Sequence, residues 1–416
     1  MKKVLKDINV KGKKVLVRVD YNVPLDASLN ITNDKRIVAT IPTIEYLLEQ
    51  NAAIILISHL GRPKGKFVPE MSLKPVAVRL NELLGKPIKF IGGDCISEES
   101  KKAAANLKPG EILLLENLRF HPEEEGKDVA GDKDKVAMEE FAKQIASMGD
   151  VFVQDAFGTV HRAHASTSAV VKYVKDAAAG LLLEKELKFL GETLESPQRP
   201  FLAILGGAKV SDKIGVIENL LNKIDAIIIA GAMAYTFLRS QGVSTGTSLV
   251  ENDKLDLASE FIKKAKERKV DFLLPVDHII VNKVDFTNKQ VPQDAQVEET
   301  IDEAIPDGFM GVDIGPKSVE KFAETIKSSK TILWNGPLGV FEIDKFSKGT
   351  ITLADLVAQA TDSGAISVVG GGDSISAVKK AGVDKRISHI STGGGASLEF
   401  LEGKELPGIA ALPDKK

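Results

Sequence analysis

Short, continuous apolar runs alternate with stretches of helical periodicity along nearly the whole chain, and this alternation constrains the fold more than any other feature. Residues 15–19, 53–58 and 201–205 are three such runs, each apolar at most consecutive positions. A strand that is buried on both faces has this composition, because helices cover both sides of a parallel sheet. Repeated strand–helix units therefore predict an α/β fold with two doubly wound, mostly parallel-sheet, Rossmann-like domains.

Further elements follow from the same pattern. We expect strands near residue 88 and at 112–115, 151–154, 226–229, 271–274, 309–314, 331–334 and 366–369. We expect helices at 34–50, 74–84, 98–106 and 135–147. Residues 278–291 alternate between apolar and polar side chains, which predicts a small antiparallel addition. The polar, glycine-containing residues 123–134 predict a solvated surface insertion.

A leucine-rich helix followed by a break in the chain marks the expected domain boundary. Leucines recur at helical spacing from Leu181 to Leu194, and the segment 196–200 contains two prolines. We expect a first domain over residues 1–180, a hinge helix with its linker over 181–198, and a second domain over 199–395.

Composition narrows the class of protein. The net charge of -3 gives no reason to expect a nucleic-acid partner. No apolar run reaches about 18 residues, so no membrane span is predicted. The N-terminus lacks the long apolar core of a signal peptide. The single cysteine, Cys95, excludes an internal disulfide, suits a reducing compartment and is expected to be a structural thiol rather than a nucleophile. These features together predict a cytoplasmic protein.

Arginine gathers in the loops that follow the strands of the first half. Only ten of the 55 Lys and Arg residues are arginine, and Arg62, Arg119 and Arg162 all lie in these loops. Arg36 begins the helix after the first loop. The guanidinium fork matches phosphate or carboxylate, so these loops are predicted to bind a small anion. The alternative is that single arginines pair with local acids such as Asp20, Glu116 or Asp155.

Histidines share the same loops. Metal binding by them is not indicated, because none has a recognised metal-binding spacing and no thiolate accompanies them. The four histidines are His59, His121, His161 and His164.

The loops of the second half carry glycine instead of charge. Gly206 and Gly207 follow an apolar strand, and we expect Lys209 and Lys213 to lie on one face at the start of the next helix. Three further glycines precede Asp373, where a helix is predicted to begin. Phosphate at that helix start would need a cation beside Asp373, so Mg²⁺ is implied. The alternatives are a plain strand–helix turn at Gly206 and a simple N-cap at Asp373.

Two familiar nucleotide signatures are missing from the sequence. No Gly-x-x-x-x-Gly-Lys-Ser/Thr motif is present, which excludes a P-loop protein. No Gly-x-Gly-x-x-Gly motif follows an early strand, which argues against a dehydrogenase.

The motifs occur in an order that closely resembles the phosphoglycerate kinase family. They are Asp20-Tyr-Asn-Val-Pro, Ser58-His-Leu-Gly-Arg-Pro, Glu116-Asn-Leu-Arg-Phe-His, Asp155-Ala-Phe-Gly-Thr-Val-His-Arg-Ala-His, Gly206-Gly-Ala-Lys-Val-Ser-Asp-Lys, Trp334-Asn-Gly-Pro-Leu-Gly-Val-Phe-Glu and Gly370-Gly-Gly-Asp-Ser. The resemblance covers essentially the whole chain. It implies a monomer that transfers the acyl phosphate of 1,3-bisphosphoglycerate to ADP in glycolysis, and a C-terminal segment, residues 396–416, that returns to the first domain.

The resemblance also assigns residues to roles. The phosphoglycerate would be held by Asp20, Tyr21, Asn22, Arg36, His59, Leu60, Gly61, Arg62, Arg119 and Arg162. The nucleotide, ATP or ADP, would be held by Gly206, Gly207, Ala208, Lys213, Gly311, Asn335, Pro337, Glu342, Gly371, Gly372, Asp373 and Ser374, with Asp373 serving Mg²⁺.

The chemistry of this reaction agrees with the residues present. In the ATP-consuming direction the nucleophile is a carboxylate, which is ionised at neutral pH and needs no general base. Catalysis then rests on alignment and on neutralising charge, for which we expect Arg36, Lys209 and Lys213. Hinge closure would bring the two substrates together and exclude water. Two other functions remain open: a nicotinamide-dependent dehydrogenase of a phosphorylated acid, and a non-catalytic two-lobed anion-binding protein.

Overall fold

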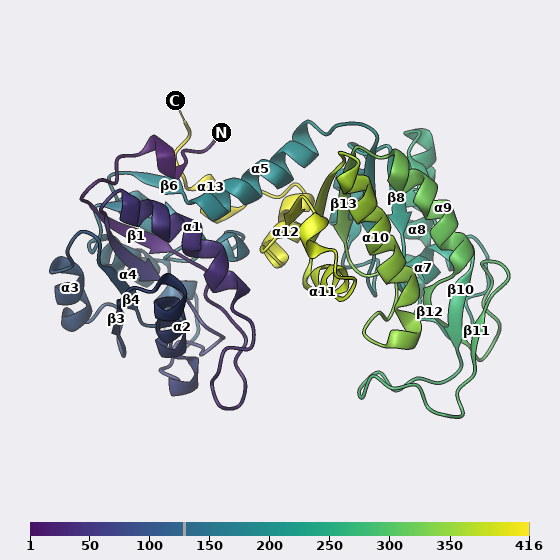
Figure 1. Cartoon of the computed structure of the whole chain (residues 1–416), viewed down its shortest axis with the longest axis horizontal. Helices are drawn as coiled ribbons and strands as arrows, with labels where there is room; N and C mark the ends of the chain where they lie inside the picture. The colour runs from purple at the N-terminus through teal and green to yellow at the C-terminus, as the bar shows by residue number, and fades with distance from the viewer. Residues whose placement is uncertain (128–129, 416) are drawn as a thin grey trace. The chain divides into compact units, whose positions relative to one another are not determined.

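The structure is a computed structural model that describes residues 1–127 and 130–415 (Figure 1). The chain divides into two compact units. Unit 1 contains Met1–Lys188 and the segment from Glu405 onward, and unit 2 contains Phe189–Lys404. Residues 128–129, within the expected insertion, and residue 416, at the end of the expected returning segment, lie outside the described residues.

The division falls inside helix α5 (Leu181–Glu195), whose existence and bounds follow the leucine pattern. The sequence placed the domain boundary at the two ends of this helix instead. Helix α12 (Gly395–Leu401), which the sequence assigned to the returning segment, belongs to unit 2. There it packs on α6 (Ile214–Leu220), and Asn219 Nδ2 donates to Leu401 O at 2.7 Å.

The parallel sheet predicted for unit 1 is confirmed, and it has six strands, one more than the five that the sequence predicts. In spatial order the strands are β3 (Ile88–Ile91), β4 (Ile112–Leu115), β2 (Ala53–Ile57), β1 (Lys14–Arg18), β5 (Val151–Gln154) and β6 (Ala177–Ala179). Side chains at alternate positions pack against α1 (Lys35–Glu49) and α2 (Lys74–Leu84), and those between them are buried on the opposite face. Helices α3 (Glu98–Ala105), α4 (Lys135–Ala146) and α13 (Pro407–Ala410) complete the unit.

Unit 2 has a second parallel sheet of six strands. In spatial order they are β15 (His389–Ile390), β14 (Ile366–Gly370), β13 (Thr331–Asn335), β7 (Phe201–Leu205), β8 (Ala226–Ile229) and β9 (Asp271–Leu273). This is the 3-2-1-4-5-6 order of the Rossmann fold. One face packs on α9 (Pro316–Ser328), α10 (Lys348–Asp362) and α11 (Gly372–Lys380), and α7 (Met233–Ser240) pairs with α8 (Leu255–Glu267).

The pairing predicted for one strand was wrong. The predicted strand at 309–314 forms as β12 (Met310–Ile314), but it pairs antiparallel with β10 (His278–Val281) and does not join the parallel sheet. Strand β11 (Val297–Glu299) completes a separate three-stranded sheet. The antiparallel addition predicted at 278–291 therefore exists, although its strands are β10, β11 and β12.

The predicted surface insertion at 123–134 is also partly wrong. It begins with the 3-10 helix η4 (Pro122–Glu125), and the side chain of Glu124 is fully buried. Burial follows from its hydrogen bonds with Ser166, described below. Among the described residues, no helix is long and apolar enough to cross a membrane.

Candidate functional site

The candidate anion site lies at the carboxyl edge of the unit 1 sheet. Strand β1 is its centre, flanked by β2 on one side and β5 on the other. The chain continues from β1 to β2 on one side and from β5 to β6 on the other, and such switch points are where doubly wound sheets bind ligands. The loops after these three strands contain most of the predicted substrate residues.

Arg36 is held in place at this edge while part of its side chain stays open to solvent. Its Nη1 donates to Asp20 Oδ1 and to Asn22 O at 3.0 and 3.1 Å. Asn22 Oδ1 in turn accepts from Gly61 N at 2.8 Å, which ties the loops after β1 and β2 together. The Arg36 side chain is 36% exposed, against 9% for Asp20. Arg36 therefore presents a positioned guanidinium to a ligand.

Two predicted substrate residues face the protein interior instead. Tyr21 is fully buried, its hydroxyl lies 3.0 Å from Thr40 Oγ1, and burial raises the pKa of its phenol. Leu60 is also buried, and its carbonyl accepts from Asn117 Nδ2 at 2.7 Å. Both side chains support the loops rather than line the open edge.

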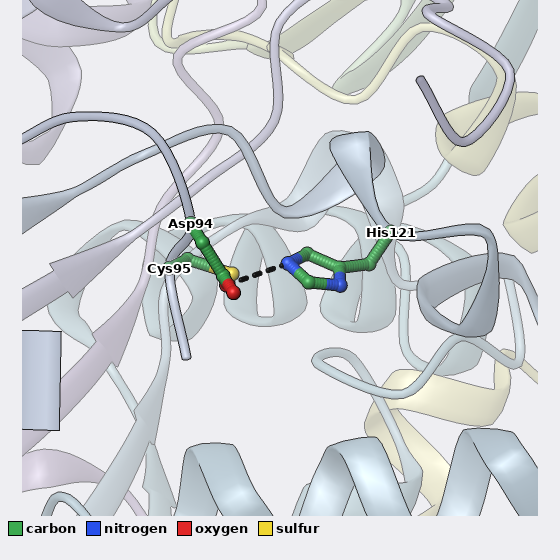
Figure 2. A group of neighbouring side chains, drawn as sticks. All are labelled: Asp94, Cys95 and His121. Atoms are coloured by element: carbon green, nitrogen blue, oxygen red, sulfur yellow. Dashed lines mark hydrogen bonds and ion pairs between the residues drawn. The ribbon is translucent and has the colours of Figure 1, made fainter. Parts of the chain in front are cut away.

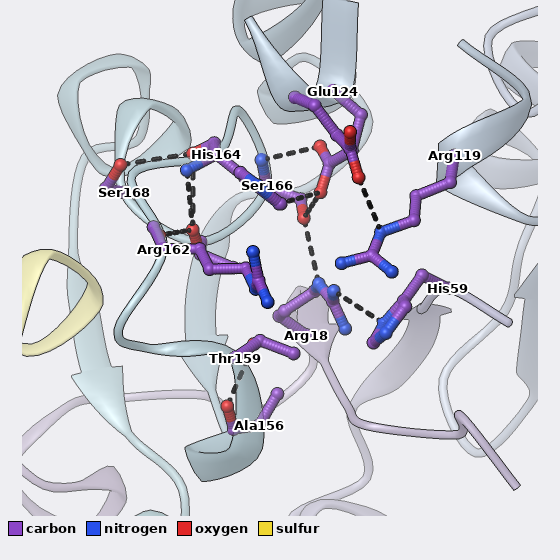
Figure 3. Close-up of polar contacts among 12 residues, drawn as sticks. Arg18, His59, Arg119, Glu124, Ala156, Thr159, Arg162, His164, Ser166 and Ser168 are labelled. Atoms are coloured by element: carbon purple, nitrogen blue, oxygen red, sulfur yellow. Dashed lines mark hydrogen bonds and ion pairs between the residues drawn. The ribbon is translucent and has the colours of Figure 1, made fainter. Parts of the chain in front are cut away.

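Arg18 is a member of this cluster that the sequence analysis missed. It is the last residue of β1 and is fully buried. Its Nε donates to Ser166 Oγ at 2.8 Å and its Nη2 donates to His59 Nδ1 at 3.2 Å. Figure 3 shows the side chains of Arg18, His59, Arg119 and Arg162 directed toward a common region. A charged residue inside an apolar run, at its carboxyl end, was the signal available in the sequence.

The buried histidines of this cluster are neutral. Because Arg18 can only donate, His59 accepts at Nδ1 and carries its proton on Nε2. Burial, followed by the charges of Arg18, Arg119 and Arg36, holds the pKa of His59 well below its usual range. Burial and the charge of Arg119 also lower the pKa of His164 to about 3. Neutral imidazoles beside several guanidinium groups add hydrogen-bonding capacity without more positive charge.

Glu124 compensates part of the buried positive charge. It accepts from Ser166 Oγ at 2.6 Å and from Ser166 N at 3.0 Å, so Ser166 bridges Glu124 to Arg18. Burial raises the pKa of Glu124, and the charge of Arg18 opposes that rise.

The remaining arginines divide into paired and unpaired. Arg119 Nε lies 3.3 Å from Glu125 Oε1, and its Nη1 donates to Gly61 O at 2.9 Å. Arg62 and Arg162 are exposed and form no ion pair with any residue the structure describes. Local pairing, the alternative left open above, therefore applies to Arg36 and Arg119 but not to Arg62 and Arg162.

Unit 2 has a pocket at the corresponding switch point, between the carboxyl ends of β7 and β13. Its volume is about 540 Å³. The lining includes most of the predicted nucleotide residues: Gly206, Gly207, Ala208, Lys213, Asn335, Pro337, Gly371, Gly372, Asp373 and Ser374. It also includes Lys209 and Asp212, but not Gly311 or Glu342. Gly311 lies in β12 against the Tyr235 hydroxyl, and Glu342 is exposed.

The glycines of this pocket allow two loops to pass in contact. A Cβ on Gly206 would lie closer than 3.0 Å to Pro337 O, which is a backbone atom with little freedom to move. At the next loop, Gly371 has a φ of +90°, a conformation that favours glycine. Gly336 N donates to Ser374 Oγ at 2.6 Å, and this hydrogen bond links the loop after β13 to the first turn of α11.

Asn335 and Lys213 form the polar floor of the pocket. Lys213 Nζ donates to Asn335 Oδ1, while Asn335 Nδ2 is buried with no hydrogen-bond partner among the described residues. A buried amide donor without an acceptor is costly unless a ligand supplies one. Burial lowers the pKa of Lys213, against the opposing charges of Asp212, Glu402 and Asp373.

The helical placement predicted for Lys209 and Lys213 was wrong. Helix α6 begins only at Ile214, because residues 210–213 form a turn closed by a hydrogen bond from Lys213 N to Val210 O at 2.8 Å. Both lysines still line the pocket, although not from one face of a helix.

Asp373 lies in the first turn of α11 and is exposed at the pocket. Asp212 is the second carboxylate on the lining. Mg²⁺ in nucleotide sites is held by one or two carboxylates together with phosphate and water, so this donor set fits a magnesium–nucleotide complex.

Two Rossmann-like units, one with an arginine-rich edge and the other with a glycine-lined pocket, define a class of protein. It is a two-domain α/β protein with a candidate ligand site at the carboxyl edge of each sheet.

Comparison with known proteins identifies the family. A family model described as phosphoglycerate kinase matches residues 5–404. The phosphoglycerate kinase of Chlorobium phaeobacteroides (strain BS1) is 55% identical over 413 residues, covering 99% of this chain and 100% of the relative. That of Clostridium botulinum (strain Hall / ATCC 3502 / NCTC 13319 / Type A) is 53% identical, covering 100% and 99%.

Solved structures give the same result. The phosphoglycerate kinase of Coxiella burnetii superposes with a TM-score of 0.87 at 42% identity, covering 99% of this chain and 98% of the other. That of Pyrococcus horikoshii OT3 gives 0.76 at 30% identity, with the same coverage. The chain belongs to the phosphoglycerate kinase family, and is therefore a phosphotransferase with a carboxyl group as acceptor. Neither the dehydrogenase nor the non-catalytic binding protein is supported.

Proposed function

We propose that the arginine-rich edge of unit 1 binds the phosphoglycerate and that the pocket of unit 2 binds ADP or ATP. The observation that supports this most is the different chemistry of the two switch points. Unit 1 offers guanidinium groups, two of them unpaired, and unit 2 offers glycine-lined space beside a buried amide that lacks an acceptor among the described residues. The first suits a small polyanion and the second suits a flat base and a phosphate chain.

In the ATP-consuming direction, the carboxylate of 3-phosphoglycerate attacks the γ-phosphoryl group. No residue has to remove a proton from it, since the carboxylate is already ionised. Arg36, fixed by Asp20 and Asn22 O, would neutralise charge on the moving group, and Lys209 would contact the same group. Lys213 would stay with the nucleotide phosphates, because its ammonium is already anchored to Asn335.

Mg²⁺ would be held at Asp373, with the nucleotide phosphates and water as further ligands. The ion, when bound, neutralises charge on the phosphate chain. Asp373 serves this role because it is exposed at the pocket and lies beside the amides of Gly371 and Gly372.

Transfer requires the two ligands to meet, so we propose that the units close by bending near α5 and near residues 391–395. Closure would also exclude water, which would otherwise hydrolyse the acyl phosphate. We further propose that the protein acts as a cytoplasmic monomer in glycolysis.

Arg36→Ala tests the role of this guanidinium in a coupled assay with ADP and 1,3-bisphosphoglycerate. We expect kcat to fall by about 100-fold or more, because a donor to the transferring group is lost, while circular dichroism stays unchanged. Arg79→Ala is the matched control, since Arg79 is a half-exposed arginine on α2 that pairs with Asp34 and Glu82. Near-normal turnover of Arg36→Ala, or an equal loss in Arg79→Ala, would contradict the assignment.

A further inference from the structure

Three potential metal ligands meet in unit 1 at a place that the proposed function does not use. Asp94 and Cys95 lie in the turn between β3 and α3, and His121 lies between the 3-10 helices η3 (Leu118–Phe120) and η4. One donor atom from each residue lies within 4.8 Å of the other two. Figure 2 shows the edge of the His121 ring facing the Asp94 carboxylate, with the Cys95 sulfur beside that carboxylate.

We propose that Asp94, Cys95 and His121 bind one transition-metal ion of the Zn²⁺ type, with water as the fourth ligand. Zinc accepts sulfur, imidazole nitrogen and carboxylate oxygen at about 2.0–2.3 Å, which places tetrahedral donors roughly 3.3–3.8 Å apart. The donor atoms here all lie within 4.8 Å of one another, so their separations exceed the upper end of that range by about 1 Å at most. A thiolate donor excludes Mg²⁺ and Ca²⁺, which take oxygen ligands.

The exposure of Asp94 and His121 gives the ion a path from solvent. The side chain of Asp94 is 52% exposed and that of His121 is 20% exposed, whereas Cys95 is buried. The Cys95 thiol makes no hydrogen bond to any other residue in the described part of the chain. Asp94 Oδ1 accepts from Ile96 N at 2.8 Å and lies 2.9 Å from His121 Nε2. Asp94 Oδ2 can therefore take the ion without breaking the turn, while Nε2 exchanges its carboxylate partner for the metal.

Glu123 is an independent observation in favour of the ion. Its Oε2 is buried, has no hydrogen-bond partner among the described residues, and lies 3.8 Å from His121 Nδ1. A metal on Nε2 would leave the ring N–H on Nδ1, which faces this carboxylate. Metal-bound histidines usually donate their second N–H to a carboxylate or carbonyl in this way.

Binding of the metal ion displaces a proton from the protein. The Cys95 thiol forms a sulfur–metal bond and releases its proton to solvent. Because Arg119 lies two residues before His121, the ion would also connect the β3–α3 turn to the substrate loop.

Calorimetric titration of tag-free, chelator-treated protein with Zn²⁺ alone, without nucleotide, tests the proposal. A parallel titration with Co²⁺ reports sulfur ligation through its thiolate charge-transfer absorption. We expect one ion per chain and a cobalt–thiolate band. Cys95→Ser should abolish the band and weaken zinc binding by at least about 100-fold. Removing a hydrogen bond to a metal ligand would weaken binding by less than this.

Three further variants test the second ligand and provide controls. Asp94→Asn should weaken zinc binding while retaining the cobalt–thiolate band, and it remains informative if Cys95→Ser folds poorly. Glu98→Gln, an exposed carboxylate on α3, and Asp373→Asn, in the unit 2 pocket, should bind zinc as the wild type does. Absence of the cobalt–thiolate band in the wild type, or equal zinc affinity of wild type and Cys95→Ser, would overturn the proposal.

Discussion

Asp155→Asn should remove a pH dependence of stability that originates in unit 1. Asp155 follows β5 and is fully buried. Its Oδ1 accepts from the backbone N–H groups of Leu182 and Leu183 at 2.9 and 3.1 Å, in the first turn of α5. Its Oδ2 is buried with no hydrogen-bond partner among the described residues. Asparagine keeps the accepting Oδ1 and removes the titration.

The sign and size of the effect follow from the pKa of Asp155. Burial raises it from 3.8 to about 7, against the opposing hydrogen bonds from Thr43, Leu183 and Leu182. Between these two values the folded state binds a proton more tightly than the unfolded state, so stability falls as the pH rises. The difference corresponds to about 4 kcal/mol, at about 1.36 kcal/mol for each pKa unit. Relative to Asp155→Asn, the wild type should therefore lose about 4 kcal/mol between about pH 4 and pH 8.

Urea unfolding of both proteins over this pH range, followed by far-ultraviolet circular dichroism, measures the difference. Fluorescence of Trp334, the only tryptophan in the sequence and a fully buried residue of β13, follows unit 2 separately. Asp313→Asn is the matched control, because burial raises the pKa of Asp313 to about 7 as well, but in unit 2. A stability difference between wild type and Asp155→Asn that stays constant with pH would refute the reasoning.

Two further substitutions test the two sites. Gly206→Ala should weaken ADP binding, measured by calorimetry, and destabilise the protein by about 1–3 kcal/mol, because its Cβ would press on Pro337 O; an unchanged ADP affinity would count against the pocket. Arg18→Met should cost about 3–5 kcal/mol in urea unfolding, because it leaves the Glu124 carboxylate buried without its compensating charge. Adding Glu124→Gln should restore part of that loss, and a double variant no more stable than Arg18→Met would contradict the pairing.

The sequence predicts well what depends on local pattern. The parallel strands, the extent of α5 and the gathering of loop residues at the carboxyl edges all follow from hydrophobic periodicity and from the geometry of parallel sheets. Most residues that line the pocket of unit 2 were also predicted, because glycines directly after a buried strand indicate a tight turn or a close backbone approach.

The sequence fails where a residue's environment is made by a distant segment. Glu124 lies in a polar stretch that predicts exposure, and its burial depends on Ser166, 42 residues further on. The strand at 309–314 looks like the other apolar runs, but its partner β10 gives it an antiparallel neighbour. The donors near Cys95 likewise include His121, which no sequence spacing connects to it.

The return of the chain to unit 1 has a consequence for biosynthesis. Lys3 N donates to Pro413 O at 2.9 Å, Lys415 N donates to Met1 O at 2.8 Å, and Gly408 N donates to Val160 O at 2.8 Å. Unit 1 therefore cannot complete its hydrogen bonding until residues 408–415 have left the ribosome. Unit 2 is continuous from Phe189 to Lys404 and has no such dependence. During translation, the second unit in the sequence is thus the first that can reach its complete native structure.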